Sequence, residues 1–264
     1  MQHDADLERL LEGNGMRKLI FLCYIVSTCV FAKPQVLKFS QEDLTEDRKI
    51  KLCELFPEDC INSNIWALKR IEGNEYYFIS QEKIYFLQEQ NNNFRIINHW
   101  DFLNYIPKES RPNWFGNGKV LGVSVNNALY PIDKNNFAIG VRYGWGDNLQ
   151  IEGLVQENKM DFVKLEKDGR YTSLIDNVPY YYFLMTWHCL DGELDSDPKA
   201  KCIENEEFNL DVKYLEPKKW EMTMKFERDP SPFSKHKAFQ VHQSFIVNLN
   251  NSNEIRVPED WLKY

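Results

Sequence analysis

The sequence predicts a mainly β protein, with an antiparallel meander or sandwich-like sheets and one N-terminal helix, after a cleavable signal peptide. Three observations carry this prediction. Short runs rich in Ile, Phe, Tyr and Trp alternate with turn residues, which is typical of antiparallel sheets. A basic and then apolar segment near the N-terminus is typical of a secretory leader. Four cysteines follow this segment, an even number suited to disulfides.

The predicted signal peptide spans residues 16–32. It opens with Arg17 and Lys18, continues through the apolar residues 19–26, and ends in Val-Phe-Ala before a cleavage point after Ala32. Its apolar part is shorter than the roughly 20 residues that cross a bilayer. Export to the periplasm or the extracellular space is therefore expected.

Residues 1–15 are acidic and do not resemble a leader, so we interpret them as an over-long N-terminal extension with Met16 as the start. Two alternatives remain open: a retained, uncleaved anchor, and a lipoprotein lipidated at Cys29. Residues 33–264 are expected to form a single exported β-rich domain. A boundary within residues 107–118, which are rich in Pro and Gly, is the alternative.

The charge of the chain bears on its partners. Forty acidic residues against 32 Lys and Arg give a net charge of −8. An acidic surface repels phosphate backbones and anionic lipids, which argues against nucleic acid and for another protein, possibly a basic one, as partner. No stable membrane span is expected after cleavage, and the oligomeric state is not predicted.

Cysteine spacing predicts two local disulfides, Cys53–Cys60 and Cys189–Cys202. Each closes a short loop, which the chain-entropy model values at about 2–3 kcal/mol. A zinc site formed by these cysteines is the alternative, but six and twelve intervening residues do not match the close spacing of zinc ligands.

One helix is predicted over residues 41–55, with Ser40 as its N-cap and Pro57 after its end. The Cys53–Cys60 bond is expected to join the helix to the strand that follows. Residues 100–105 are expected to form one helical turn. Strands are predicted at 65–71, 75–79, 83–88, 94–98, 119–125, 137–143, 149–156, 160–165, 171–175, 180–189, 208–215, 220–227 and 241–248.

Some of these segments carry a finer expectation. Residues 144–148 and Asn158-Lys159 are interpreted as turns. The apolar segment 180–189 is expected to be a strand buried on both faces or an inner strand of a sandwich, whereas the alternation along 220–227 predicts one solvent-facing side.

Metal-ligating patterns are weak in this sequence. A calcium loop would use Glu193, Asp195, Asp197 and Glu204, but Pro198 stands where such a loop needs Gly, so a solvated acidic loop is favoured. No metal or other cofactor is expected. His188 is interpreted as a core histidine bonded to backbone, and His236 as part of a surface loop.

Catalytic motifs are also weak. The segment 122–126 lacks the second Gly of a nucleophile elbow, and no phosphate-binding Gly loop precedes a helix. Whether the chain is an enzyme stays open, with a non-enzyme favoured. Binding candidates are Trp114, Phe115 and Trp145 in Gly-bearing loops, with Asp147 beside Trp145.

Two functions are compatible with these observations. The first is an exported, disulfide-stabilised protein-binding domain of the cell envelope, such as an inhibitor or immunity-type protein that acts by occlusion. The alternative is a secreted protein that binds or hydrolyses carbohydrate, with Trp114 and Trp145 as exposed stacking surfaces.

Overall fold

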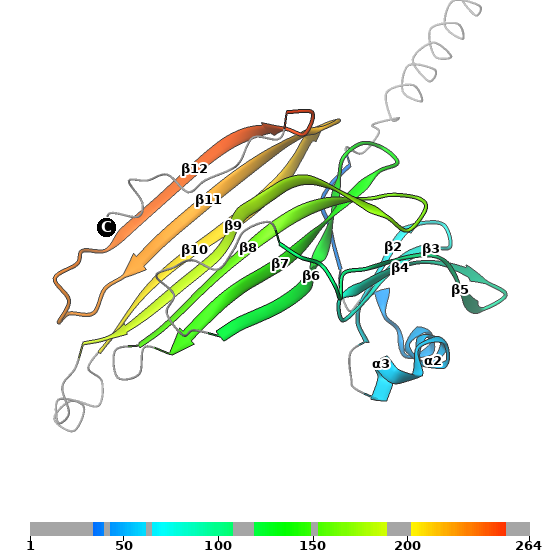
Figure 1. The fold of residues 1–264 in the computed structure, drawn as a ribbon, viewed down its shortest axis with the longest axis horizontal. Coiled ribbons are helices and arrows are strands. Elements are labelled where there is room, and N and C mark those ends of the chain that lie inside the picture. Colours follow the sequence, from blue (N-terminus) through cyan, green and yellow to red (C-terminus); the bar gives the residue numbers. More distant parts are fainter. Residues whose placement is uncertain are drawn as a thin grey trace, which may run out of the picture. The chain divides into compact units, whose positions relative to one another are not determined.

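The computed structural model describes residues 34–39, 43–61, 65–107, 119–148, 153–188 and 202–251. The predicted signal peptide lies outside these ranges, as do Ser40, Trp114, Phe115 and the acidic loop. Among the described residues the protein is mainly β, with two antiparallel sheets and two short helices (Figure 1). No helix in this part of the chain has the length and apolar character needed to cross a membrane.

The helical region differs in detail from the prediction. Helix α2 spans Glu46–Leu55, and its N-cap is Thr45, whose hydroxyl accepts a hydrogen bond from the backbone N–H of Arg48. Pro57 does not end the helical region but begins α3 (Pro57–Ile61), because proline suits the first helical position. The predicted Cys53–Cys60 disulfide is present, and it joins α2 to α3, not to a strand.

The predicted meander is confirmed as a four-stranded sheet of order β2-β3-β4-β5. Two-residue turns connect its strands, as the turn residues in the sequence indicate. Residues 100–101 are the end of β5 and not a helical turn, since Trp100 pairs with Ile84 of β4. The strand bounds are β2 Ile65–Glu72, β3 Glu75–Ser80, β4 Lys83–Gln90 and β5 Asn93–Asp101.

The second sheet has eight strands in the order β1-β6-β7-β8-β9-β10-β11-β12. It contains fewer but longer strands than predicted, because the expected turn at Asn158-Lys159 lies inside β8 and two predicted strands are joined in β9. The bounds are β1 Leu37–Lys38, β6 Lys119–Pro131, β7 Phe137–Asn148, β8 Gly153–Leu165, β9 Tyr171–Trp187, β10 Ile203–Glu216, β11 Lys219–Asp229 and β12 Phe239–Asn248.

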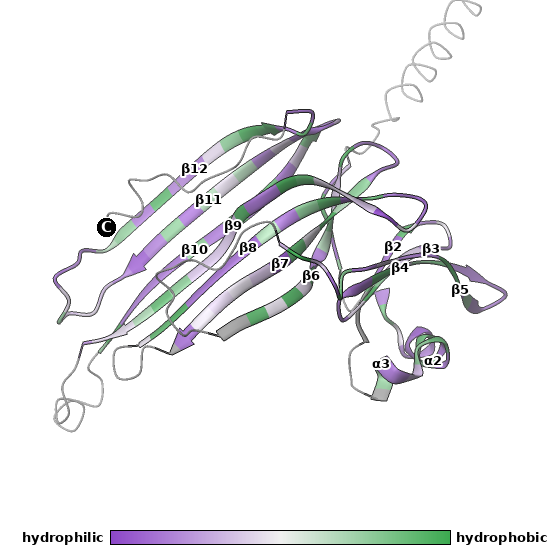
Figure 2. Cartoon of the chain, viewed as in Figure 1, coloured by the Kyte–Doolittle hydropathy of each residue, from purple (hydrophilic) through white to green (hydrophobic). Residues whose placement is uncertain are grey.

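The eight-stranded sheet curls so that β11 meets β6 across the main apolar core. The Trp220 indole N–H donates a hydrogen bond to the Pro131 carbonyl at 2.7 Å, and its ring packs against Tyr130 and Phe162. Buried residues of β11 alternate with partly or fully exposed ones, as predicted, and Figure 2 shows this alternation in hydropathy. By contrast, residues 180–186 of β9 are only half-buried, so burial on both faces was wrong there.

The opposite face of β6–β8 packs against the four-stranded sheet. Trp100 and Ile84 of the small sheet share a buried cluster with Leu129, Ile139 and Val163 of the large one. The Trp100 indole also donates to the Glu166 carbonyl at 2.9 Å. The main core is therefore lined mostly by strands of the large sheet, and the small sheet packs on the other face of β6–β8.

Candidate functional site

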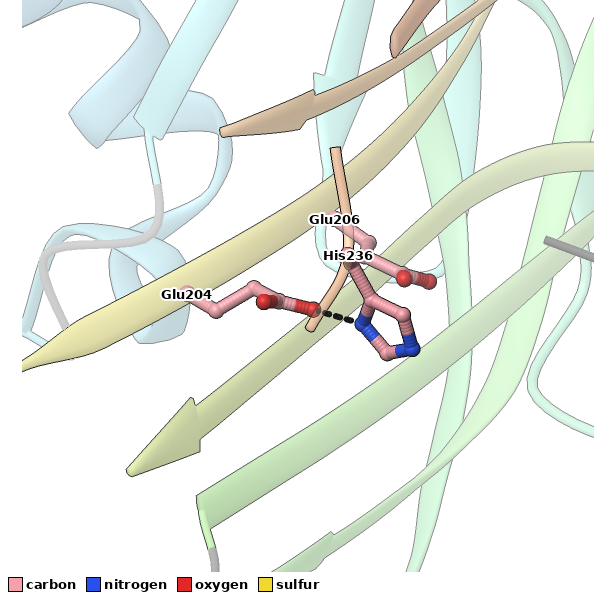
Figure 3. A group of neighbouring side chains, drawn as sticks. All are labelled: Glu204, Glu206 and His236. Atoms are coloured by element: carbon pink, nitrogen blue, oxygen red, sulfur yellow. Dashed lines mark hydrogen bonds and ion pairs between the residues drawn. The ribbon is translucent and has the colours of Figure 1, made fainter. Parts of the chain in front are cut away.

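The candidate site lies where β9 and β11 end and β10 begins, beside the loop that joins β11 to β12. Glu206 of β10 pairs with Leu184 of β9 and with Arg228 of β11. Paired residues in an antiparallel sheet point to the same face, and so do residues two apart on one strand. Glu204, Glu206 and Arg228 therefore share a face. With His188 and His236 they form what we call the Glu204 cluster, of which Figure 3 shows Glu204, Glu206 and His236.

The cluster lies on the same face of β10 and β11 as residues of the main core. Phe208 pairs with Phe226, and both are buried in that core. Two residues farther along these strands, the same face carries Glu206 and Arg228. The β10–β11 ladder ends at Asn205–Asp229, so Glu204 lies one residue beyond the last paired position.

A hydrogen-bonded loop positions His236 over the strand ends. The Ser231 carbonyl accepts from the Ser234 backbone N–H at 3.0 Å, and the Ser231 hydroxyl accepts from the Phe233 N–H at 3.2 Å. The Ser234 hydroxyl in turn accepts from the His236 N–H at 3.0 Å. Serine side chains commonly fix turns in this way, so the local sequence orients His236.

Glu206 and Arg228 form a buried ion pair. Arg228 Nε lies 2.6 Å from Glu206 Oε1, and both side chains are largely excluded from solvent. Arg228 Nη2 is buried and has no hydrogen-bond partner among the described residues. The pair neutralises its own charges, but such pairs add little net stability because desolvation offsets their attraction.

Among the described residues, Glu204 has no Lys or Arg paired with it on the neighbouring strands: it pairs with Thr186 of β9 and lies beyond the end of the β10–β11 ladder. It is 3% exposed, and Glu204 Oε1 lies 2.7 Å from His236 Nδ1. Glu204 Oε2 lies 3.4 Å from His188 Nε2, and within the described chain neither of these two buried atoms has a hydrogen bond. Leaving a buried polar atom unsatisfied costs about 1–3 kcal/mol. The two imidazoles therefore contact the carboxylate without satisfying it fully.

The environment keeps Glu204 ionised. Burial raises the pKa of this carboxyl, but hydrogen bonds from Ser234 and His236 lower it by more, so the pKa of Glu204 is below its usual value. The backbone N–H of His188 donates to the Cys202 carbonyl at 2.9 Å, which fits the predicted backbone contact. Its ring, however, faces Glu204, and this role was not predicted.

The geometry favours binding of a positive group. Ligand atoms of Glu204, Glu206 and His236 all lie within 4.8 Å of one another. The His236 side chain is half exposed, which leaves the cluster accessible from solvent. Carboxylate oxygens with an imidazole nitrogen are ligands that divalent transition metals accept.

Two large aromatic side chains are exposed close to the cluster in sequence. Trp187 immediately precedes His188 and is 43% exposed, but it pairs with Ile203 and therefore projects from the sheet face opposite to Glu204. Phe233 lies in the same loop as His236 and is 49% exposed. Large aromatic residues are enriched among the residues that dominate binding energy at protein interfaces.

Most sequence-predicted binding residues are not part of this site. Trp145 is 4% exposed because residues 144–148 belong to β7 and its ring packs edge-on against Tyr143, so the expected exposed indole was wrong. Asp147 is half-buried on β7, paired with Val155 of β8. Trp114 and Phe115 lie outside the described residues.

The other predicted residues have mixed outcomes. Glu204 belongs to the cluster, but Glu193, Asp195 and Asp197 lie outside the described ranges. Cys202 is disulfide-bonded, and Cys189, its predicted partner, also lies outside them. The sequence did contain a signal for the cluster: Glu204 and Glu206 are two apart, which places both on one face of a strand.

A second polar group is buried inside the protein. Asp161 of β8 is fully buried and accepts hydrogen bonds from the Tyr105 hydroxyl at 2.6 Å and the Asn177 backbone N–H at 2.6 Å. The Tyr143 hydroxyl donates to it at 3.1 Å. Its position beside register shifts between β8 and β9 indicates that it stabilises an irregular part of the sheet.

Comparisons of this chain with protein-family models, with curated proteins and with solved structures gave no match.

Proposed function

We propose that this chain is an exported, disulfide-stabilised protein-binding domain that contacts its partner through the end of the sheet around the Glu204 cluster. The observation that carries the proposal is the exposure of two large aromatic side chains at this end of the sheet: Phe233 in the loop that carries His236, and Trp187 on the sheet face opposite to Glu204. Interface hot spots combine such aromatic anchors with Arg and with polar groups shielded from water.

Disulfides support the exported location. The Cys53–Cys60 bond is present and Cys202 is also disulfide-bonded. Such bonds persist in oxidising compartments and are rare in the cytosol. A signal peptide at residues 16–32 would account for export to such a compartment. Intact mass of the natively exported protein tests it: cleavage after Ala32 and the loss of four thiol hydrogens are expected, and an uncleaved, reduced chain would contradict export.

The charge of the chain indicates the kind of partner. A net charge of −8 steers association toward a basic protein, by an attraction that weakens as salt rises. The partner would cover the end of the sheet, contact Trp187 on one face and Phe233 in the loop after β11, and place a cation near Glu204. If the covered surface of the partner is its own functional site, the chain acts as an inhibitor by occlusion.

Site-specific photo-crosslinking tests this proposal. A photoreactive phenylalanine analogue is placed at Trp187, at Phe233 and, as a control, at Leu103, which is exposed in the turn after β5. In cells that make the protein, the first two positions should give one adduct of the same discrete mass, reduced at high salt. Equal adducts at all three positions, or none at the first two, would refute the proposed surface.

The carbohydrate alternative has no comparable support. It relied on a pair of exposed indoles, and Trp145 is buried. We therefore pursue only the protein-binding function.

A further inference from the structure

We propose that the Glu204 cluster is a binding site for a divalent transition metal ion of the Zn²⁺ class. The ligands would be Glu204, Glu206 and His236, and His188, which faces Glu204 alone at 3.4 Å, would move to become the fourth. This inference goes beyond the protein-binding function and is argued from the buried groups and not from the exposed aromatic residues; a bound metal ion would take the place of the partner's cation at Glu204.

The first step is the convergence of ligand atoms. Glu204 and Glu206 project from one face of β10, and the loop after β11 places His236 against them (Figure 3). One ligand atom from each of the three lies within 4.8 Å of the others. A single ion at about 2.0–2.2 Å from each atom requires only a small closure of these side chains.

The second step is the pair of atoms without hydrogen bonds. Glu204 Oε2 and His188 Nε2 are both buried and face each other at 3.4 Å, yet they form no hydrogen bond in the part of the chain described. Two ligands at about 2.0–2.1 Å from one tetrahedral zinc are separated by about 3.3–3.4 Å. The observed separation matches two neighbouring ligands of one ion better than a hydrogen bond.

The net charge of the cluster also favours a cation. Glu204 and Glu206 carry two negative charges and Arg228 carries one positive charge, so the cluster has an excess of negative charge when its imidazoles are neutral. Arg228 already contacts Glu206 Oε1 at 2.6 Å, which leaves the other oxygen of Glu206 for the ion. The Arg228 contact also orients Glu206, as outer-shell partners of metal ligands commonly do.

The ligand set also selects the kind of metal. Calcium and magnesium prefer sites made of oxygen, whereas imidazole suits Zn²⁺, Ni²⁺ and Cu²⁺. Two imidazoles at one carboxylate therefore favour the second group. The three converging ligands leave one position of a tetrahedral site, which His188 would fill if its ring moved toward the ion.

The test is a zinc titration of the full oxidised chain, purified without a histidine tag and freed of metal by a chelator. Isothermal titration calorimetry with ZnCl₂ should give one ion per chain, and Co²⁺ substitution should give the visible spectrum of tetrahedral coordination. H236A changes a half-exposed loop residue and is not expected to impair folding. It should weaken zinc binding at least tenfold, as should H188A.

The matched control is H242A, which removes an exposed histidine of β12 that is not in the cluster. It should leave the zinc affinity within twofold of the wild type. E204Q keeps the side-chain shape, and its circular dichroism and melting temperature report whether it folds. A folded E204Q with unchanged affinity, no stoichiometric zinc binding, or equal losses in H236A and H242A would each overturn the proposal. Crosslinking at Trp187 is read separately, so its failure does not affect this result.

Discussion

Replacing Tyr105 by phenylalanine measures how this fold accommodates a fully buried carboxylate. Asp161 has no exposed surface and accepts hydrogen bonds from Tyr105, Tyr143 and Asn177. The Tyr105 bond, at 2.6 Å, connects the segment after β5 to β8 of the large sheet. The variant removes this bond and keeps the ring, so packing changes little.

The expected cost follows from the charge of the acceptor. Hydrogen bonds to charged groups contribute about 1.5–3 kcal/mol, and Asp161 Oδ2 would lose its donor from Tyr105. We therefore expect Y105F to lower the free energy of unfolding by about 1.5–3 kcal/mol near neutral pH.

The loss should depend on pH. Burial raises the pKa of Asp161 above its ordinary value of 3.8, and the hydrogen bonds only partly offset this. A raised pKa in the folded state means that the contribution of Asp161 to stability is fully present below the unfolded pKa and lost as pH rises through the folded pKa. The Tyr105 hydroxyl favours the ionised form, so its removal should cost more near neutral pH than at about pH 4.

Urea unfolding followed by tryptophan fluorescence measures both effects, provided the transition is two-state. Y171F is the control, because the Tyr171 ring packs 5.8 Å from that of Tyr105 while its hydroxyl has no hydrogen bond among the described residues. It should cost less than about 0.5 kcal/mol. Equal losses in the two variants, or a Y105F loss that does not change with pH, would refute the role assigned to Asp161.

Three further predictions follow from the packing. The double variant C53S/C60S should lose about 2–3 kcal/mol of stability, because the bond closes a short loop between α2 and α3; urea unfolding measures this, and reductant should lower the stability of the wild type by more, because it also breaks the disulfide of Cys202. W220F should lose about 2–4 kcal/mol, because it removes the hydrogen bond to Pro131 and leaves a cavity; a loss below about 1 kcal/mol would contradict the role of Trp220. G144A should lower the melting temperature, because its Cβ would lie 2.2 Å from the Glu157 carbonyl oxygen, whereas a wild-type melting temperature would show that the strands can separate.

Much of the fold could be predicted from the sequence because its local signals agree. In the meander, turn residues such as Gly73-Asn74 and Gln81-Glu82 separate apolar runs of strand length, and each turn is where the sequence indicates. The single solvent-facing side of β11 was equally readable, since polar and apolar residues alternate there without interruption.

The errors occurred where turn-like residues lie inside long strands. Gly144 is in β7 because the neighbouring strand approaches too closely for any side chain, not because the chain turns. Asn158 and Lys159 lie beside a register shift in β8, and Asn177 has a φ of 59° within β9. Irregularities of this kind carry the same residues as turns, so sequence alone does not separate the two.

For a different reason, sequence spacing could predict only that Glu204 and Glu206 share a face, and not the rest of the candidate site. Its members come from the end of β9, from β10, from β11 and from the following loop, so no local motif joins His188 to His236. The pairing of β10 with β9 and with β11, together with the fold of the loop after β11, brings the five residues together. Such sites depend on register, which the sequence indicates only through the pattern of each strand.

The two proposals place an external positive group at the same carboxylate for one physical reason. Glu206 has a cation across the strand, but Glu204 lies beyond the β10–β11 ladder, and among the described residues it contacts two imidazoles and Ser234. A sheet shaped for stability alone would gain by an apolar residue here, because buried charges seldom repay their desolvation. The proposals separate cleanly: a W187A/F233A variant should retain zinc affinity, and a chelator should not abolish crosslinking. If the double variant lost zinc, the aromatic residues would support the cluster instead of a partner.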